Sequence, residues 1–219
     1  MPFPNRPTTA RGRFITFEGI DGSGKTTQLR MLAGALRGQG RAVVETVEPG
    51  GTDLGQQIRR ILLDPANSAL HARTELLLYF ASRAQNVEQV IRPALVAGSL
   101  VLCDRFTDST LVYQGCGRGL EPATVIQLDA IACQGLKPDL TVLIDIDPET
   151  SLARAKKRNQ RVGPSESRID EESAAFHERV RNGYLALAAT EPERFLVIDG
   201  RGEISQVYAR IQEALQSRV

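Results

Sequence analysis

Hydrophobic and polar positions along the chain follow two alternating patterns. Two apolar runs, Ser99–Asp104 (SLVLCD) and Leu140–Ile146 (LTVLIDI), are typical of strands buried on both faces of a parallel sheet. Three further strands are predicted at Arg13–Glu18, Ala42–Val47 and Phe195–Asp199. Segments with helical spacing lie between and after the strands: one begins near Lys25, and the others are Thr52–Leu63, Glu75–Ala97, Asp108–Gly115, Pro122–Cys133, Pro148–Lys157, Glu171–Ala189 and Ile204–Arg218.

This alternation predicts an α/β fold, a doubly wound parallel five-stranded sheet with helices on both faces. The chain of 219 residues is long enough for one such domain and its core. We expect the domain to cover 13–219, after a flexible N-terminal tail at 1–12. In such sheets ligands bind beyond the carboxyl ends of the strands, so functional side chains are expected there.

Charge and cysteine content narrow the class of protein. There are 27 Lys and Arg against 26 Asp and Glu, a net charge of +1, which argues against bulk binding to nucleic acid or to an anionic membrane. No apolar stretch approaches the ~18–20 residues that span a bilayer, and the N-terminal residues lack the apolar run of a signal peptide. The cysteines, Cys103, Cys116 and Cys133, are odd in number and widely spaced, which argues against a disulfide framework. A cytoplasmic protein is expected.

The stretch FEGIDGSGKTTQ (17–28) carries the strongest chemical signal. It fits G-x-x-x-x-G-K-[ST] between a predicted strand and a predicted helix, the context that a phosphate-binding P-loop requires. Backbone N–H groups and the helix N-terminus surround phosphate oxygens, Lys25 reaches the β- and γ-phosphates, and Thr26 ligates Mg²⁺. The predicted ATP-binding residues of the loop are Gly19, Ile20, Asp21, Gly22, Ser23, Gly24, Lys25, Thr26 and Thr27.

A P-loop alone leaves the phosphate acceptor open, because kinases, motor ATPases and GTPases share it. The chain has no NKxD-type guanine-reading motif and no apolar strand that ends in Asp-Glu, the usual ATPase pair. Instead the strand SLVLCD ends in Asp104 followed by Arg105. This pair suits a site that holds Mg²⁺ near Asp104 and a second phosphate on Arg105.

Four segments together make the chain resemble the bacterial-type thymidylate kinases of the P-loop nucleoside monophosphate kinase family. They are FEGIDGSGKTTQ, TVEPGGT (46–52), LLYFASRAQ (77–85) and DRFTDSTLVYQG (104–115). The resemblance runs from about Phe14 to the C-terminus. It implies a P-loop NTPase-type fold with a basic lid and transfer of the γ-phosphate of Mg-ATP to dTMP, giving dTDP for dTTP synthesis. It also implies a homodimer.

The resemblance further implies a set of acceptor-binding residues. Asp21 lies by the acceptor's 3′-hydroxyl, Tyr79 stacks on thymine, Arg83 donates to the base, and Tyr113 crowds the ribose 2′-position. Tyr79 and Arg83 are four residues apart and share a helix face, whereas Phe80 is expected on another face, as core. Val47 stands where the family often has Arg. The dTMP-binding residues implied are Asp21, Glu48, Pro49, Arg59, Tyr79, Arg83, Arg105, Ser109, Thr110, Tyr113 and Gln114.

The basic stretch RAKKRNQRVGPSESR (154–168) is predicted to belong to a lid at about 154–170, because Gly163-Pro164-Ser165 interrupts any helix and basic side chains stabilise transferring phosphoryl oxygens. Arg158 is the expected catalytic finger, with Arg161 and Arg168 as alternatives, and the resemblance places Arg154 on adenine. The catalytic residues expected are Lys25, Arg59, Arg105 and Arg158, with Thr26 and Asp104 at the metal. His71 and His177 lie in no motif and are expected at the surface.

Two other functions stay open on the residues alone. One is a P-loop kinase that acts on another nucleoside monophosphate or on a deoxynucleoside. The other is an acceptor-independent P-loop ATPase, a switch or partition type that would not respond to dTMP. The Tyr79 and Arg83 pair and the segment DRFTDST favour a dTMP acceptor over both.

Overall fold

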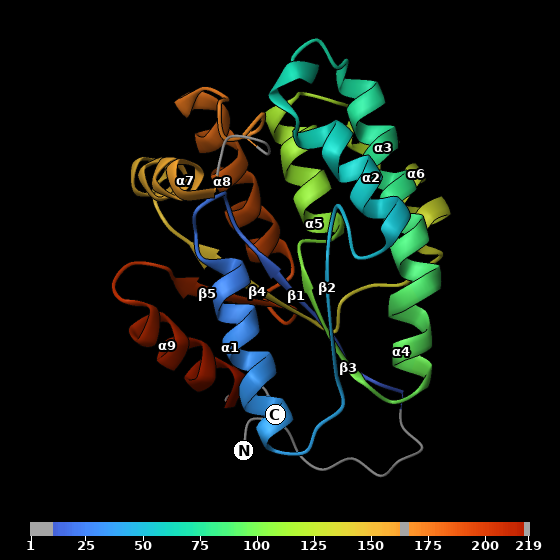
Figure 1. The fold of residues 1–219 in the computed structure, drawn as a ribbon, viewed down its shortest axis with the longest axis vertical. Coiled ribbons are helices and arrows are strands. Elements are labelled where there is room, and N and C mark those ends of the chain that lie inside the picture. The colour runs from blue at the N-terminus through green and yellow to red at the C-terminus, as the bar shows by residue number, and fades with distance from the viewer. Residues whose placement is uncertain (1–10, 163–166, 217–219) are drawn as a thin grey trace.

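A computed structural model describes residues 11–162 and 167–216, and these form a doubly wound α/β structure (Figure 1). The sheet has five parallel strands in the order β2-β3-β1-β4-β5. Their bounds agree with the predicted runs to within one residue: β1 Phe14–Glu18, β2 Val43–Val47, β3 Leu100–Asp104, β4 Leu140–Asp145 and β5 Phe195–Asp199.

The helices of the described residues cover both faces of this sheet (Figure 1). Their bounds are α1 Lys25–Gly38, α2 Asp53–Leu63, η1 Pro65–Asn67, α3 Ala72–Asn86, η2 Val87–Ile91, α4 Arg92–Val96, α5 Thr107–Thr110, η3 Leu111–Gly117, α6 Pro122–Cys133, α7 Pro148–Val162, α8 Ala174–Thr190 and α9 Ile204–Gln216. Of these, η1 is a 3₁₀ turn, and η2 and η3 are π-helical segments.

Alternate side chains of β1 enter different cores. Ile15 and Phe17 pack with α1 and α9 on one face of the sheet. Phe14 packs on the opposite face with residues of α3, α4 and α6. Glu18 has the parity of Phe14, because successive side chains of a strand point to opposite faces. Its carboxylate therefore lies on the side covered by α5 and α8.

The strand register brings three functional loops to one edge of the sheet. Asp104 at the end of β3 is aligned with Phe17 of β1 and with Val47 of β2. The P-loop, the loop that begins with Glu48, and Arg105 therefore leave the sheet at the same level. This is the edge at which parallel α/β sheets bind ligands.

Four predicted helices differ from the structure, and one of them, Glu171–Ala189, is α8, which begins at Ala174. The expected helix Glu75–Ala97 begins at Ala72 and consists of α3, η2 and α4. Pro93 explains the π segment, because a helix that contains proline loses a backbone donor and must change its hydrogen-bond spacing. The expected helix Asp108–Gly115 is the short α5 followed by η3. The predicted lid begins within α7, which continues to Val162.

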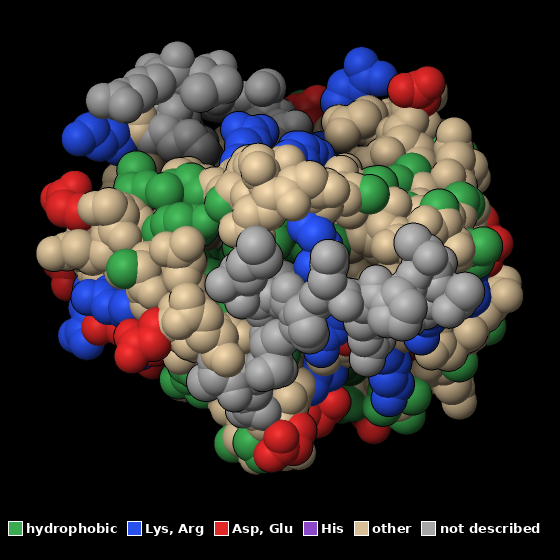
Figure 2. Space-filling view, turned by 90° about the horizontal axis from the view of Figure 1, so that it is seen from below, with side chains coloured by type: hydrophobic (Ala, Val, Ile, Leu, Met, Phe, Trp, Pro, Cys, Tyr) green, Lys and Arg blue, Asp and Glu red, His purple; other side chains and the backbone are tan. Residues whose placement is uncertain are grey.

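Parts of three predictions fall outside the described residues. These are positions 1–10 of the expected tail, 163–166 of the expected lid with the side chains of 158–162, and the end of the expected last helix at 217–218. In the remainder of the chain, no helix is both long and apolar enough to cross a membrane. All three cysteines are free thiols. Acidic and basic side chains both occur around the face seen in Figure 2, which agrees with the small net charge.

Candidate active site

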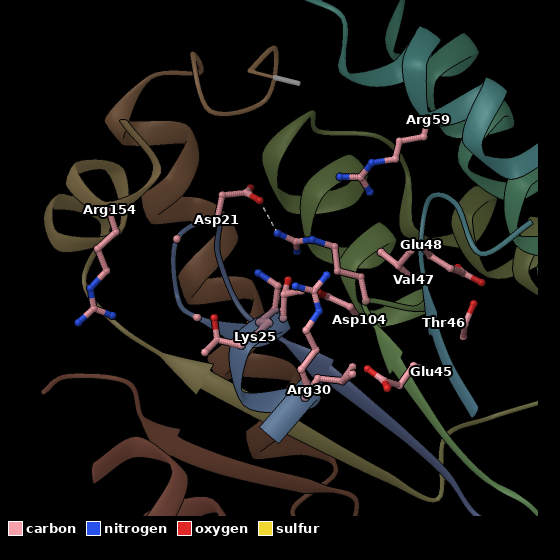
Figure 3. Close-up of a pocket in the computed structure, with 16 residues that line it drawn as sticks. Asp21, Lys25, Arg30, Glu45, Thr46, Val47, Glu48, Arg59, Asp104 and Arg154 are labelled. Carbon is pink, nitrogen blue, oxygen red and sulfur yellow. Dashed lines mark hydrogen bonds and ion pairs between the residues drawn. The ribbon is translucent and has the colours of Figure 1, made fainter. Parts of the chain in front are cut away.

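A cavity of about 530 Å³ lies at the carboxyl edge of the sheet. It is bounded by the P-loop, the start of α1, the ends of β2 and β3, one residue of α2 and one of α7 (Figure 3). Its lining residues are Asp21, Gly22, Gly24, Lys25, Thr26, Thr27, Leu29, Arg30, Glu45, Thr46, Val47, Glu48, Arg59, Asp104, Arg105 and Arg154. Eleven of the predicted site residues thus line one cavity, together with Val47: Asp21, Gly22, Gly24, Lys25, Thr26, Thr27, Glu48, Arg59, Asp104, Arg105 and Arg154.

The P-loop presents a cation and backbone donors to this cavity. Gly24 precedes α1 in a left-handed conformation with φ 97°, which glycine adopts without steric cost. Lys25 is buried, and its Nζ donates to the carbonyl of Ile20 at 3.0 Å. Burial and the nearby Arg105 lower the pKa of Lys25 to about 8. Lys25 is therefore a pre-positioned cation whose charge is only partly compensated by protein groups.

Thr26 and Asp104 form the predicted oxygen pair of a metal site. The Thr26 hydroxyl donates to the Asp104 carboxylate across the gap between α1 and β3. Both side chains line the cavity, as does Lys25, and Figure 3 shows Asp104 near Lys25. Hydroxyl and carboxylate oxygens are the ligands that Mg²⁺ prefers, and Mg²⁺ commonly takes one or two protein groups with the rest of its shell from phosphates and water. This donor set fits Mg²⁺.

Arg105 joins the end of β3 to the P-loop. Its backbone has φ 70°, uncommon for a residue other than glycine. Its Nη2 donates to Asp21 at 2.7 Å, the contact dashed in Figure 3, and Tyr113 donates to the other oxygen of the same carboxylate at 2.8 Å. Burial alone would raise the pKa of Asp21, but Arg105 and Lys25 hold it below its usual range. Asp21 is thus an ionised carboxylate within the P-loop.

Two other arginines reach the cavity from opposite sides. Arg59 of α2 donates from Nη1 to the carbonyl of Pro49 at 3.0 Å. Arg154 of α7 donates from Nη1 to the carbonyl of Gly200 at 3.2 Å. Figure 3 shows Arg59 on the side of α2 and Arg154 on the far side of the P-loop. The cavity therefore has a cationic group at each end and Lys25 between them. This arrangement suits two ligands whose phosphates meet near Lys25.

Glu48, an expected dTMP contact, lines the cavity, and its carboxylate is also bonded to α3. Its carboxylate accepts hydrogen bonds from Arg83 and from Asn86, at 3.1 Å for the latter, and both donors belong to α3. Burial raises the pKa of Glu48, while Arg83 opposes that rise. The backbone N–H of Gly50 donates to Ser82 of the same helix at 3.1 Å. The carboxylate thus anchors the Glu48–Pro49 loop, which has a cis peptide bond, onto α3.

The surroundings of Arg83, one of the two expected base-binding residues, differ from the prediction in one respect. The Arg83 guanidinium lies over the ring of Phe80 with its carbon 4.9 Å from the ring centroid, so the assignment of Phe80 to a face away from Arg83 is wrong. Phe80 is core, as expected, at 4% exposure, and Tyr79 is half-buried. Arg83 Nη2 donates to Thr110 at 2.8 Å, and Arg83 Nη1 is buried without a partner among the described residues.

Two more expected contacts are directed elsewhere. The Gln114 amide donates to Glu75 at 2.8 Å instead of facing the cavity. Arg168, an alternative for the lid finger, is buried and donates to the same carboxylate at 2.6 Å and to the carbonyl of Leu62. Arg118, directly after η3, completes this cluster. Glu75 therefore holds Gln114 and Arg168 in the framework around the site.

His177 is not at the surface. It is 1% exposed on α8, packs edge-on against Phe176, and neither ring nitrogen has a hydrogen-bond partner among the described residues. Its burial explains why the expectation was wrong. His71 is exposed as expected and caps α3 through Nδ1. The side chains of Arg158 and Arg161 lie outside the described residues.

Sequence reasoning missed three residues that support the site. Asn86 holds Glu48, and Glu18 and Tyr184 lie behind Arg105, bonded to each other at 2.8 Å. Glu18 has the signal that singled out Asp104, an acid at the end of an apolar strand, and could have been found by it. Tyr184 has no such signal within its own helix. Its partner Glu18 is 166 positions away.

Comparison with known proteins agrees with this geometry. A family model described as Thymidylate kinase matches residues 17–211. The chain is 52% identical over 209 residues to a thymidylate kinase of Geotalea uraniireducens, covering 95% of this chain and 98% of the relative. It is 54% identical over 188 residues to one of Solidesulfovibrio magneticus, covering 85% and 90%. A crystal structure of thymidylate kinase from Ehrlichia chaffeensis aligns with TM-score 0.75 and 35% identity over 94% of this chain and 99% of that one. The chain belongs to the thymidylate kinase family.

Proposed function

We propose that the protein transfers the γ-phosphate of ATP to the 5′-phosphate of dTMP, giving dTDP for dTTP and DNA synthesis. One observation carries the proposal. Lys25 and Thr26 of the P-loop share a cavity with Arg59 and Arg105, which come from different elements. A hydrolase needs only the first pair, whereas a transferase to a phosphorylated acceptor needs a second group of phosphate ligands.

The reaction requires alignment and charge neutralisation more than covalent chemistry. Lys25 reaches the β- and γ-phosphates from within the P-loop. Arg59 and Arg105 grip the acceptor phosphate in line with the γ-phosphate, since a guanidinium offers paired donors to phosphate oxygens. Asp21, ionised and bonded to Arg105, keeps that guanidinium oriented and lies by the 3′-hydroxyl of the acceptor.

The proposal includes Mg²⁺, held by Thr26 and Asp104. When bound, Mg²⁺ neutralises charge on the β- and γ-phosphate oxygens. The protein's part is to keep both oxygen ligands at the cavity wall, where the Thr26 hydroxyl already meets the Asp104 carboxylate.

Thymine and deoxyribose are assigned to the side of α3 and η3. Tyr79 stacks on the base, and Arg83 donates to a base carbonyl through Nη1, the nitrogen without a partner among the described residues. An unpaired buried donor costs free energy unless a ligand accepts from it, which supports this assignment. Tyr113 closes the 2′-position and so favours a deoxy sugar, while Ser109 and Thr110 hold Arg105 and Arg83.

Arg154 is assigned to adenine, because it lines the far end of the cavity from Arg59. Arg158 is proposed as the catalytic finger, with Arg161 beside it at the ATP phosphates. Their backbone belongs to α7, the same helix as Arg154. Closure of the segment at about 154–170 would expel water from the phosphates and add positive charge during transfer.

A homodimer in the cytoplasm is also proposed. Leu77 of α3 and Ile126 and Ile131 of α6 are exposed apolar side chains on helices that pack together. Burial of such side chains against a second copy is favourable. Sedimentation velocity tests the assembly: Ile131→Glu together with Leu77→Glu should give a monomer where the native chain gives a dimer. A native monomer refutes it.

The assay that tests the function measures ADP formation from Mg-ATP with dTMP, dUMP, UMP, dCMP, AMP or thymidine. Strong stimulation by dTMP, weak stimulation by dUMP and none by thymidine are expected. Stimulation by another monophosphate instead would support a different nucleoside monophosphate kinase. ADP formation that is independent of any acceptor would support the ATPase alternative and end the proposal.

A further inference from the structure

Glu18 is a fully buried carboxyl group that the proposed mechanism does not use. It ends β1, directly before the P-loop, and is 0% exposed. One oxygen accepts from the backbone N–H of Phe106 at 2.7 Å. The other accepts from the Ser109 hydroxyl at 2.6 Å and from the Tyr184 hydroxyl at 2.8 Å. Glu18 thus collects donors from the β3–α5 loop, α5 and α8.

The same two hydroxyls lead to Arg105. Its Nη1 donates to Ser109 at 3.1 Å and to Tyr184 at 3.2 Å. A hydroxyl has a single hydrogen, and an ionised carboxylate has none to give. When Glu18 is ionised, both hydroxyls must direct their hydrogens to it, so both turn lone pairs toward Arg105. The ionised carboxylate therefore fixes the polarity of the contacts that orient the guanidinium.

A third proton fits this cluster. The Ser109 and Tyr184 oxygens are 2.7 Å apart, so they and the Glu18 oxygen form a triangle with three short edges. The two hydroxyl hydrogens can form hydrogen bonds along only two of these three contacts. A proton on Glu18 supplies the third and makes one hydroxyl an acceptor from the carboxyl group. The hydrogen of that hydroxyl is then no longer held by Glu18, so the lone pair that it presented to Arg105 is no longer fixed in direction. Burial and the nearby Asp108 raise the pKa of Glu18 to about 7, so this proton is within physiological reach.

The charged and titratable groups around Glu18 come from each neighbouring element. They are Arg105 in the β3–α5 loop, Asp108 in α5, Tyr184 in α8, Lys25 in α1 and Cys103 in β3. Asp108 is the neighbour that disfavours ionisation of Glu18 by its charge. It forms its own ion pair with Arg194 at 2.6 Å and makes no hydrogen bond to Arg105 among the contacts found in the described residues.

We propose that Glu18 is a positioning residue that holds Arg105 in its phosphate-gripping orientation through Ser109 and Tyr184, and that proton uptake by this cluster loosens the grip on the acceptor phosphate. The inference rests on the proposed function. Charge alone predicts the opposite sign, because an ionised Glu18 repels a phosphate. Removal of its charge would then tighten dTMP binding, whereas positioning requires binding to weaken.

The experiment measures kcat and the KM for dTMP between about pH 6 and about pH 9, a range that includes the raised pKa of Glu18 of about 7, at saturating Mg-ATP. In Glu18→Gln the amide N–H groups donate where the carboxylate accepted, so the hydroxyls turn hydrogens toward Arg105. The KM for dTMP at pH 8 should rise about ten-fold, the effect of weakening one hydrogen bond to a charged group. Tyr184→Phe, which removes one of the two acceptors, should give a smaller rise.

The pH profile separates positioning from a general loss of structure. In the native enzyme the KM for dTMP should rise as the pH falls through about 7, the pKa of Glu18. The dTMP phosphate also titrates, but identically for every variant. Asp108→Asn removes the charge next to Glu18, so the rise in the KM for dTMP should begin at a lower pH than in the native enzyme. At pH 8 the KM of this variant should be unchanged. In Glu18→Gln the KM for dTMP should rise at low pH only as much as the titration of the dTMP phosphate requires.

The outcomes distinguish this inference from the function on which it rests. Native enzyme without dTMP-dependent ADP formation would refute the proposed function. Native activity with an unchanged or lower KM for dTMP in Glu18→Gln and Tyr184→Phe would refute only the role of Glu18. An unshifted profile in Asp108→Asn would refute the proton-linked part. If Glu18→Gln does not fold, Tyr184→Phe and Asp108→Asn still decide.

Discussion

Glu48 and Arg83 form an ion pair whose side chains are 2% and 1% exposed. The pair joins the loop after β2 to α3, and Arg83 also donates to the carbonyl of Phe106 at 3.1 Å. One residue therefore fixes the positions of two loops at the edge of the site. Because both charges are out of water, loss of either partner leaves the other uncompensated.

Arg83→Met should lower the free energy of unfolding by about 3–5 kcal/mol, the usual cost of breaking a buried ion pair on one side. The double variant Arg83→Met with Glu48→Gln should recover part of this loss, because neither partner then leaves an uncompensated buried charge. Urea denaturation at pH 7.5 measures both variants. The control is Arg37→Met, which removes an ion pair to Glu45 with the arginine 48% exposed and should cost at most about 1 kcal/mol. Equal losses for Arg37→Met and Arg83→Met would contradict the prediction.

Asp104→Asn should raise the Mg²⁺ concentration needed for half-maximal activity by about 10–100-fold, a range seen when groups that support a metal are replaced. The asparagine keeps the size of the side chain but removes the charge that attracts the ion. A Mg²⁺ titration of dTMP-dependent ADP formation measures the shift. Asp53→Asn, at an exposed position in the first turn of α2, is the control and should behave as the native enzyme. An unchanged Mg²⁺ requirement in Asp104→Asn would remove Asp104 from the metal site.

His177 should make the fold sensitive to acid. Burial lowers its pKa below the ordinary value of 6.5, so the unfolded chain takes up a proton more readily than the folded one. Above about pH 6.5 the side chain is neutral in both the folded and the unfolded chain, and its titration does not affect stability. As the pH falls below that value, the free energy of unfolding decreases by up to about 1.4 kcal/mol per pH unit for one proton. His177→Phe should lose less stability than the native chain between pH 7.5 and pH 5.

The control for His177→Phe is His71→Asn, which keeps a side-chain acceptor at the exposed cap of α3. Its stability should fall with acid as in the native chain. Urea denaturation at several pH values measures all three proteins. If His177→Phe and the native chain show the same acid dependence, His177 does not carry the effect.

The parts of the site that were predictable from sequence rest on consecutive residues. Lys25 and Thr26 are positioned by their own loop and helix, and Asp104 and Arg105 by the strand that precedes them. Parallel pairing then brings the strand ends together without further information, as the alignment of Val47 with Asp104 shows. Local sequence was therefore sufficient to bring the P-loop residues and Asp104 to one cavity.

Other parts depend on contacts that no local pattern contains. Glu18 and Tyr184 meet across 166 positions, and although Glu18 stands out as an acid at the end of a strand, nothing local indicates its partner. Residues of η3 follow π-helical spacing, so directions inferred from 3.6 residues per turn rotate away from the true ones. The resemblance that placed Gln114 at the base contains no information about this local spacing. The prediction for His177 was wrong because a polar residue on a helix usually faces solvent, whereas the face of α8 that carries His177 is covered.

Gln114 provides the sharpest contrast between the sequence prediction and the structure. As a base contact it would affect the KM for dTMP, whereas as a partner of Glu75 it affects stability. Burial alone would raise the pKa of Glu75, but hydrogen bonds from Arg118 and Gln114 lower it. Gln114→Ala removes one of these donors and leaves a space in a buried region. The free energy of unfolding should therefore fall by about 1–3 kcal/mol.

The KM for dTMP of Gln114→Ala should stay within about two-fold of the native value, because no hydrogen bond to substrate is removed. The control is Gln85→Ala, which removes an exposed amide bonded to Gln89 and should change neither quantity. Urea denaturation and steady-state kinetics on the same preparations separate the two roles. A large rise in the KM with unchanged stability would return Gln114 to the base-binding set. A loss of stability with an unchanged KM would keep it with Glu75, as a group that shapes the site from behind.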